Sequence, residues 1–173
     1  GVIQLANTGK FLGYFTSNKS KLTPQQMFLK LIYTKEQEKK SELLNTLPST
    51  FSNVFVDTNG AAYSTCMGIG NALLKKHSTN GTNMLGNVKT SSALTDVTAN
   101  KDGIIYASDS HGMIWVYTSQ GEVIFQLGAE AADKDISGLF TSLTTIAVDN
   151  SGNIWTADGE KGYLQSFTPT EYA

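Results

Sequence analysis

Apolar and polar residues follow one short pattern at three places along the chain, in residues 51–66, 94–109 and 143–158. Each segment has apolar residues at its first, fourth and sixth positions, then a polar turn, and then a β-rich run with a central aromatic residue. This order predicts a β-hairpin, because glycine in the turn readily adopts the positive φ that tight turns need. The turn glycines are Gly60, Gly103 and Gly152, and the aromatic residues are Tyr63, Tyr106 and Trp155.

A second pair of strands is expected beside these hairpins. Residues 114–128 alternate in polarity around Gly121, a more polar version surrounds Gly81, a similar segment surrounds Gly9, and residues 163–167 begin another. Each complete unit is then a four-stranded antiparallel meander of about 40–50 residues, which is the strand number and period of a propeller blade. One such sheet cannot cover both of its own faces, so the repetition predicts sheets that stack around a shared axis.

The repeated segment also resembles a known motif. Residues 146–158, IAVDNSGNIWTAD, follow the order apolar-x-Val-Asp-x-x-Gly-x-Ile-aromatic-x-Ala-Asp, an earlier strand ends in Leu-Gly at 127–128, and Gly138 and Phe140 form a Gly-x-Phe lead-in. In these features the chain resembles the NHL-repeat β-propeller family over nearly everything outside residues 18–50. The resemblance implies a propeller fold but little about activity, because propellers carry unrelated functions. The Asn and Arg that the family often has after its second strand are absent here.

We therefore predict an all-β protein, a β-propeller of NHL-like, four-stranded antiparallel blades present as an incomplete set. The pieces at the two ends do not complete a closed ring, so we expect the chain to be part of a longer propeller of about six blades. Apolar sheet faces left open at its two ends predict that the chain associates with itself. The predicted blade pieces are residues 1–17, 51–92, 94–139 and 143–173.

Residues 18–50 lie between two blades and have a helical pattern instead. Thr23 and Pro24 are typical of a helix cap and a first helical residue. Thr34 begins a second such pattern, which ends at Pro48. We expect two short helices, which either wall the mouth of the propeller or pack on its rim. The first apolar helical stripe consists of Met27, Phe28, Leu31 and Ile32.

The composition argues against several classes of function. The net charge is −2 and all 13 basic residues are lysines, so the chain lacks the arginine side chain that best binds phosphates and guanine edges. No apolar run approaches the ~20 residues of a membrane helix. Cys66 is the only cysteine, which excludes a disulfide within the chain, and we expect it to fill space. Few cysteines and the bias to lysine favour a bacterial protein outside the cytoplasm, although no signal peptide is visible.

Candidate ligand-binding residues follow the second strand of two repeats. Asp109 and His111 belong to one loop, and Asp158 and Glu160 belong to the next. In a propeller these loops lie on the face that usually carries the binding site, and carboxylates and an imidazole can bind polar or charged ligands. The repeated aspartates also fit a structural role, in which they accept hydrogen bonds from turn amides, and this alternative stays open. No catalytic residue and no metal ligand is assigned.

Three other conspicuous residues are expected to have no direct function. His77 is predicted to be solvated at a hairpin tip. Trp115 and Trp155 alternate with polar neighbours in strands, and they are predicted to pack between blades.

Two functions remain open. The favoured one is a binding or scaffold module for a protein, a peptide or a glycan, with no cofactor and no enzyme activity. The alternative is a calcium-dependent lactonase or esterase that resembles the gluconolactonase-like propellers. In that case Asp109, Asp158 and Glu160, with Asn53 and Asp96 facing the tunnel, would bind calcium through oxygen atoms. The sequence contains no Gly-x-Ser-x-Gly, His-Glu-x-x-His, P-loop or dinucleotide-binding motif.

Overall fold

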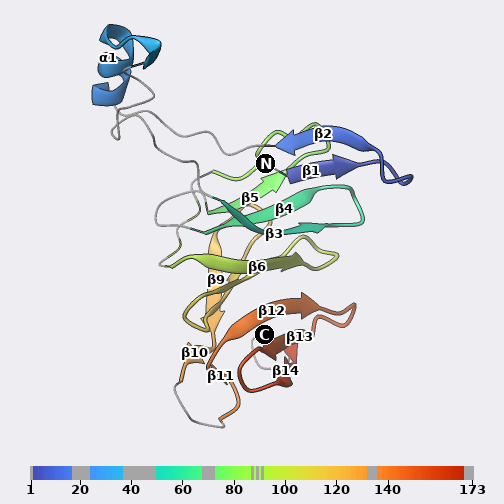
Figure 1. The fold of residues 1–173 in the computed structure, drawn as a ribbon. Coiled ribbons are helices and arrows are strands. Elements are labelled where there is room, and N and C mark those ends of the chain that lie inside the picture. Colours follow the sequence, from blue (N-terminus) through green and yellow to red (C-terminus); the bar gives the residue numbers. More distant parts are fainter. Residues whose placement is uncertain are drawn as a thin grey trace. The chain divides into compact units, whose positions relative to one another are not determined.

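The computed structural model describes residues 2–16, 24–36, 50–67, 73–86, 88, 90, 92–131 and 136–169. The chain divides into two compact units, one of residues 3–50 and one of residues 51–173. Strands make up almost all of the regular structure, as the alternating pattern predicted (Figure 1). The first unit contains a hairpin and a helix, and the second contains three larger sheets.

Three antiparallel sheets form most of the second unit, and the strands of each sheet pair in chain order. The first sheet consists of β3 (Phe51–Val56), β4 (Ala62–Cys66) and β5 (Leu74–His77). The second sheet consists of β6 (Leu94–Ala99), β7 (Ile105–Asp109), β8 (Ile114–Tyr117) and β9 (Val123–Leu127). The third sheet consists of β12 (Leu143–Val148), β13 (Ile154–Asp158) and β14 (Tyr163–Phe167).

The three repeated segments form the hairpins β3–β4, β6–β7 and β12–β13, which confirms the prediction from their pattern. The first strand of each hairpin has the same irregularity in its pairing with the second strand, just before Asn53, Asp96 and Thr145. These three residues therefore occupy equivalent places in three successive sheets.

The turns of the three hairpins require glycine at one position. A φ near +80° is strained for a residue with a Cβ atom, so glycine is needed there. The φ angles are 81°, 81° and 86° at Gly60, Gly103 and Gly152.

The three sheets pack on one another through their first strands, with β6 in contact with both β3 and β12 (Figure 1). One apolar core lies between the first and second sheets, and it includes Cys66 and Trp115 as expected. A second core lies between the second and third sheets. Burial of one large apolar side chain stabilises a protein by about 1.5–3 kcal/mol, so these cores hold the sheets together. Their fully buried members include Tyr63, Leu74, Ile105 and Tyr117 in the first core and Ile114, Val116, Phe140 and Ile154 in the second.

A small parallel pair of strands connects the second sheet to the third. It consists of β10 (Ala129–Glu130) and β11 (Leu139–Phe140). Phe140 belongs to the Gly-x-Phe segment singled out in the sequence, and its ring centroid lies 6.3 Å from that of Phe167 in β14. The lead-in segment therefore contributes an aromatic contact to the second core.

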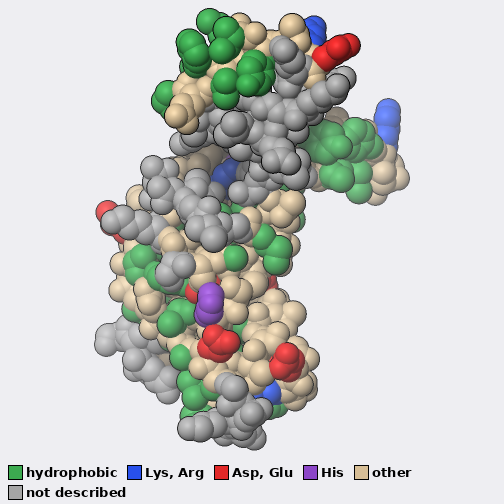
Figure 2. Space-filling view, turned by 60° about the vertical axis from the view of Figure 1, so that its left-hand side comes forward, with side chains coloured by type: hydrophobic (Ala, Val, Ile, Leu, Met, Phe, Trp, Pro, Cys, Tyr) green, Lys and Arg blue, Asp and Glu red, His purple; other side chains and the backbone are tan. Residues whose placement is uncertain are grey.

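The first unit contains the hairpin of β1 (Val2–Leu5) and β2 (Phe11–Thr16) and the helix α1 (Pro24–Ile32). The first of the two expected helices is α1, and most of the second falls on residues 37–49, outside the described residues. Most apolar side chains of α1 are exposed, and hydrophobic side chains gather on the surface of this helix (Figure 2). The exposed ones are Met27, Phe28, Leu31 and Ile32. A role of the helices beside a binding mouth stays a prediction. No helix of the described part of the chain is long and apolar enough to cross a membrane.

Candidate functional site

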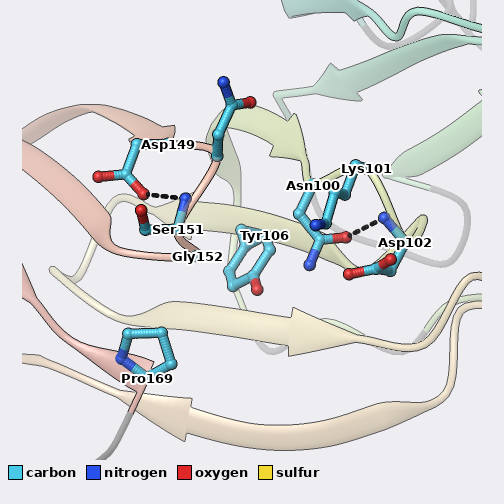
Figure 3. A pocket seen from close by; sticks show the side chains of 9 residues that line it. Asn100, Lys101, Asp102, Tyr106, Asp149, Ser151, Gly152 and Pro169 are labelled. Carbon is cyan, nitrogen blue, oxygen red and sulfur yellow. Dashed lines mark hydrogen bonds between the residues drawn. The ribbon is translucent and has the colours of Figure 1, made fainter.

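An open groove lies between the turns of two neighbouring hairpins, β6–β7 and β12–β13 (Figure 3). Its volume is about 320 Å³, which is at the small end of ligand sites. Residues 100–102 form one wall, residues 149–152 form the other, and Tyr106 and Pro169 complete the lining. In Figure 3 the ring of Tyr106 lies between the two turns. The groove thus joins two sheets at the end where their first two strands connect.

The wall formed by residues 100–102 is held by a side chain of the turn itself. Asn100 Oδ1 accepts hydrogen bonds from the backbone N–H groups of Asp102 (3.0 Å) and Ile104 (2.9 Å). Asp57 closes the turn of the first hairpin in the same way. A short side chain that binds its own backbone fixes the turn without help from outside it.

The opposite wall is held by Asp149. Its Oδ1 accepts hydrogen bonds from the backbone N–H groups of Ser151 (2.8 Å) and Asn153 (2.9 Å). Its Oδ2 accepts from the side-chain amide of Asn153 (2.8 Å) and the indole N–H of Trp155 (3.1 Å). The two side-chain hydrogen bonds, that of Asn153 first, lower the pKa of Asp149 to about 2. This wall is therefore preorganised and negatively charged at neutral pH.

Several polar side chains of the walls remain open to solvent. Lys101, Asp102, Asn150 and Ser151 are exposed. Within the part of the chain that the structure describes, the ammonium group of Lys101 and the carboxylate of Asp102 have no hydrogen bond or ion pair. Groups of both charges are thus free to contact a ligand in the groove.

The first predicted pair of site residues, Asp109 and His111, belongs to one turn. The carboxylate of Asp109 is buried and accepts hydrogen bonds at both oxygens. Its Oδ1 binds the backbone N–H groups of His111 (2.9 Å) and Met113 (3.0 Å). Its Oδ2 binds the indole N–H of Trp115 (2.9 Å) and the hydroxyl of Ser92. The structure thus joins the pair through the backbone of His111, whose imidazole is exposed.

The second predicted pair, Asp158 and Glu160, repeats this arrangement. Asp158 is buried, and its oxygens accept hydrogen bonds from the backbone N–H groups of four residues. Burial raises the pKa of Asp158, but these four hydrogen bonds outweigh it and hold the pKa below its ordinary value. The side chain of Glu160 is exposed. The donors are Thr141 (2.7 Å), Ser142 (3.3 Å), Glu160 (3.1 Å) and Lys161 (3.0 Å).

These two pairs lie at the opposite ends of the strands from the groove. Asp109 ends β7 and Asp158 ends β13, whereas the groove is built from the turns that precede these two strands. No hydrogen bond joins one pair to the other among the described residues. The aspartates have the geometry of the structural alternative, and a ligand role for Asp109, His111, Asp158 and Glu160 stays a prediction.

A polar junction of three side chains, Asn53, Asp96 and Thr145, connects the first strands of the three sheets. Asp96 is buried on β6, and its Oδ1 accepts hydrogen bonds from the side-chain amide of Asn53 on β3 and from the backbone N–H of Val97 (2.7 Å). Its Oδ2 accepts from the hydroxyl of Thr145 on β12 and from the backbone N–H of Ile146 (2.9 Å). The structure thus brings the two residues proposed to face the tunnel, Asn53 and Asp96, into direct contact.

Metal binding was part of the alternative hypothesis of a calcium-dependent hydrolase. Across residues 2–16, 24–36, 50–67, 73–86, 88, 90, 92–131 and 136–169, no group of three or more His, Cys, Asp or Glu side chains could hold a metal ion. The oxygens of Asp96, Asp109 and Asp158 accept hydrogen bonds from protein donors instead. Calcium binding therefore stays a prediction of the alternative hypothesis.

The prediction that His77 is solvated is wrong. His77 ends strand β5, pairs with Ala62 and is buried, because the turn begins only at the following residue. Its Nε2 lies 3.1 Å from the hydroxyl of Ser64. Burial lowers the pKa of the ring, the positive charge of Lys75 lowers it further, and a backbone hydrogen bond with Gly81 opposes both.

The lowered pKa of His77 predicts that acid destabilises the protein. Below the ordinary imidazole pKa of about 6.5, the unfolded chain binds a proton that the folded chain excludes, so the free energy of unfolding falls as the pH falls. We expect a loss of at most about 1.4 kcal/mol between pH 7.5 and 5.5, measured by urea unfolding. The loss should disappear in His77→Gln and persist in His111→Ala. An unchanged pH dependence in His77→Gln would contradict this assignment.

Comparison with known proteins supports the fold. No family model matches the chain, and no curated protein matches it. A structure of streptogramin B lyase is similar with a TM-score of 0.52 and 14% identity, over 72% of this chain and 42% of that chain. The computationally designed Ika4 protein is similar with a TM-score of 0.51 and 14% identity, over 72% and 69%. The C-terminal WD40 domain of Sif2 is similar with a TM-score of 0.52 and 16% identity, over 71% and 32%.

The stacked antiparallel sheets and these neighbours define the class of the protein, which is a β-propeller fold. The chain spans less than half of the lyase chain and about a third of the WD40 chain. At this level of identity the likeness shows the fold alone, and the activity of a neighbour does not transfer.

The residues of the groove were not selected from the sequence. Residues 100–103 and 149–152 were interpreted as turns, which is what they form. A groove arises only because stacking places these two turns side by side, and no local pattern shows that. The available signal was the repeat itself, which implies that equivalent turns of neighbouring sheets share one edge.

Proposed function

We propose that this chain is an NHL-like propeller module that binds a segment of a protein or peptide in the groove between residues 100–102 and 149–152. The observation that carries the proposal is the groove itself, whose walls are fixed by Asn100 and Asp149 before any ligand arrives. Fixed polar walls reduce the entropy that is lost on binding. The exposed groups of Lys101 and Asp102 then meet polar or charged groups of the ligand.

A peptide suits the groove better than the other ligand class, a glycan. A peptide backbone offers donors and acceptors to Asn150 and Ser151 and carries side chains that can pair with either charge of the opposite wall. A glycan site commonly offers an open aromatic face, and the one aromatic ring of this groove, Tyr106, is buried in its floor. Two further parts of the proposal rest on composition alone, namely a bacterial source and a place outside the cytoplasm.

The test is a screen of an array of short peptides and an array of glycans with the purified chain. We expect bound sequences among the peptides, with affinities in the micromolar range typical of small, open sites. The double variant Lys101→Ala and Asp102→Ala should weaken binding of the selected peptides about tenfold or more. The matched control is Thr58→Ala with Asn59→Ala, in the equivalent turn of the first hairpin outside the groove, which should bind as the wild type does.

Three outcomes would contradict the proposal. One is that no peptide binds, another is that only glycans bind, and the third is that the groove variant and the control variant bind equally. An effect of His111→Ala or Glu160→Ala without an effect of the groove variant would place the site at the opposite end of the strands, as the sequence predicted.

A further inference from the structure

The charges that line the groove are unequal. Among the described residues of its lining, the charged ones are Asp102, Asp149 and Lys101. Two negative charges against one positive charge leave the lining with an excess of one negative charge at neutral pH. In Figure 3 the two aspartates lie on opposite sides of the Tyr106 ring. A ligand in the groove therefore meets a carboxylate on each wall.

The carboxylate of Asp149 supplies charge to the groove but little capacity to bind a ligand directly. Its two oxygens already accept four hydrogen bonds from the protein. The side-chain hydrogen bonds of Asn153 and Trp155 hold the pKa of Asp149 at about 2, so it is ionised at neutral pH. Asp149 therefore contributes a fixed negative potential to the site.

The carboxylate of Asp102 is available to a ligand instead. The side chain is exposed, and within the described part of the chain it has no hydrogen bond or ion pair, not even with Lys101. A ligand cation can therefore approach it without displacing a protein partner. The side-chain amide of Asn150 and the hydroxyl of Ser151 can both donate and accept hydrogen bonds, so they favour neither sign of charge.

An anionic ligand is the alternative, because the ammonium group of Lys101 is exposed as well. An anion beside Lys101 would be attracted by one charge and repelled by two carboxylates. A cation beside Asp102 would be attracted by both carboxylates and repelled only by Lys101. The sum of the charges in the lining therefore favours a cation.

We propose that the protein segment bound in this groove presents a lysine or arginine side chain, whose cation pairs with Asp102. This inference rests on the proposed function, since it assigns the charge of the ligand at the same site. An exposed ion pair changes affinity by about twofold to fivefold. The charge is thus expected to determine which peptides bind best, while the fixed walls determine that peptides bind.

Three forms of each peptide selected by the array screen test the charge preference. The forms carry Lys, Gln or Glu at each position in turn and are otherwise identical, and fluorescence anisotropy of the labelled peptides measures their affinity. At one position or more, the Lys form should bind about twofold to fivefold more tightly than the Gln form. The Glu form should bind most weakly there. Added salt should reduce these differences, because it screens charges at an open site.

Two variants of Asp102 and one control assign the preference to the groove. Asp102→Asn should remove the advantage of the Lys form over the Gln form. Asp102→Lys should reverse the order, so that the Glu form binds most tightly. Glu130→Gln also removes one exposed carboxylate, but from β10 and outside the lining, so it should keep the wild-type order. Far-UV circular dichroism should match the wild type in all three variants, since both positions are exposed.

The outcomes separate this inference from the proposed function. Peptides that bind in the groove but prefer Glu, or show no preference for charge, would overturn the assignment of charge and leave the peptide site intact. A preference for Lys that persists in Asp102→Lys would also overturn it, because another group would then bind the cation. If no peptide binds, the site itself is refuted, and this inference is refuted with it.

Discussion

Asp96→Ala is expected to lower the free energy of unfolding by about 3–5 kcal/mol. The substitution removes the acceptor for four donors, and two of them, the backbone N–H groups of Val97 and Ile146, lie in buried parts of strands. A buried donor without an acceptor costs about 1–3 kcal/mol. The donors also come from three different sheets, so the loss weakens both sheet-to-sheet contacts at once. Urea unfolding followed by circular dichroism measures the effect.

Two further variants distinguish the loss of the hydrogen bonds at the polar junction from a general effect of replacing an aspartate. Asp96→Asn keeps the shape and one acceptor oxygen, so it should lose roughly half as much stability as Asp96→Ala. Asp102→Ala removes an exposed aspartate of the same sheet and should change the stability by less than about 0.5 kcal/mol. A cost of Asp96→Ala as small as that of Asp102→Ala would show that the junction does not hold the sheets together.

Asp109→Ala is expected to destabilise the protein by about 2–4 kcal/mol. Asp109 is buried, and its carboxylate joins the turn after β7 to the indole of Trp115 in the first core. The turn amides can regain water when the carboxylate is lost, but the buried indole N–H cannot. The lost hydrogen bonds of the turn amides should therefore account for the smaller part of the lost stability, and the lost hydrogen bond of the indole for the larger part.

A double-mutant cycle tests this division. Asp109→Asn retains an acceptor for the turn amides, and its amide group faces the indole donor of Trp115. The double variant Asp109→Asn with Trp115→Phe should lose less free energy of unfolding than the sum of the losses in the two single variants, because the two residues share one hydrogen bond. His111→Ala should leave stability unchanged, since only its backbone N–H takes part. Strict additivity, or a large loss in His111→Ala, would refute the structural account of this turn.

The features that depend on neighbours in the sequence could be predicted. The three hairpins and their glycine turns follow from alternation and from the conformational freedom of Gly60, Gly103 and Gly152, and all three were found. The structural reading of Asp109 and Asp158 was also available, because an aspartate before a turn binds the amides that follow it.

The features that depend on stacking could not be predicted in the same way. His77 looked solvated because it is polar and precedes a turn, yet the strand pairing carries it into a buried position. Trp155 looked buried by analogy with Tyr106, and only the structure shows that its side chain is 44% exposed. The groove and the Asp96 junction both require residues from different repeats, about fifty positions apart, to meet.

The residues in the turns of the three hairpins fall into two groups, which differ in how well they tolerate substitution. The first residue of each turn accepts the closing hydrogen bonds and the last supplies the positive φ. Of the two residues between them, the second takes part in these bonds only through its backbone N–H, and the side chains of both are exposed. Evolution or an engineer can therefore diversify these middle residues with little penalty to folding. The same edge of the molecule would then serve as a display surface, on which new specificities are selected while the scaffold stays constant. The middle residues are 58–59, 101–102 and 150–151.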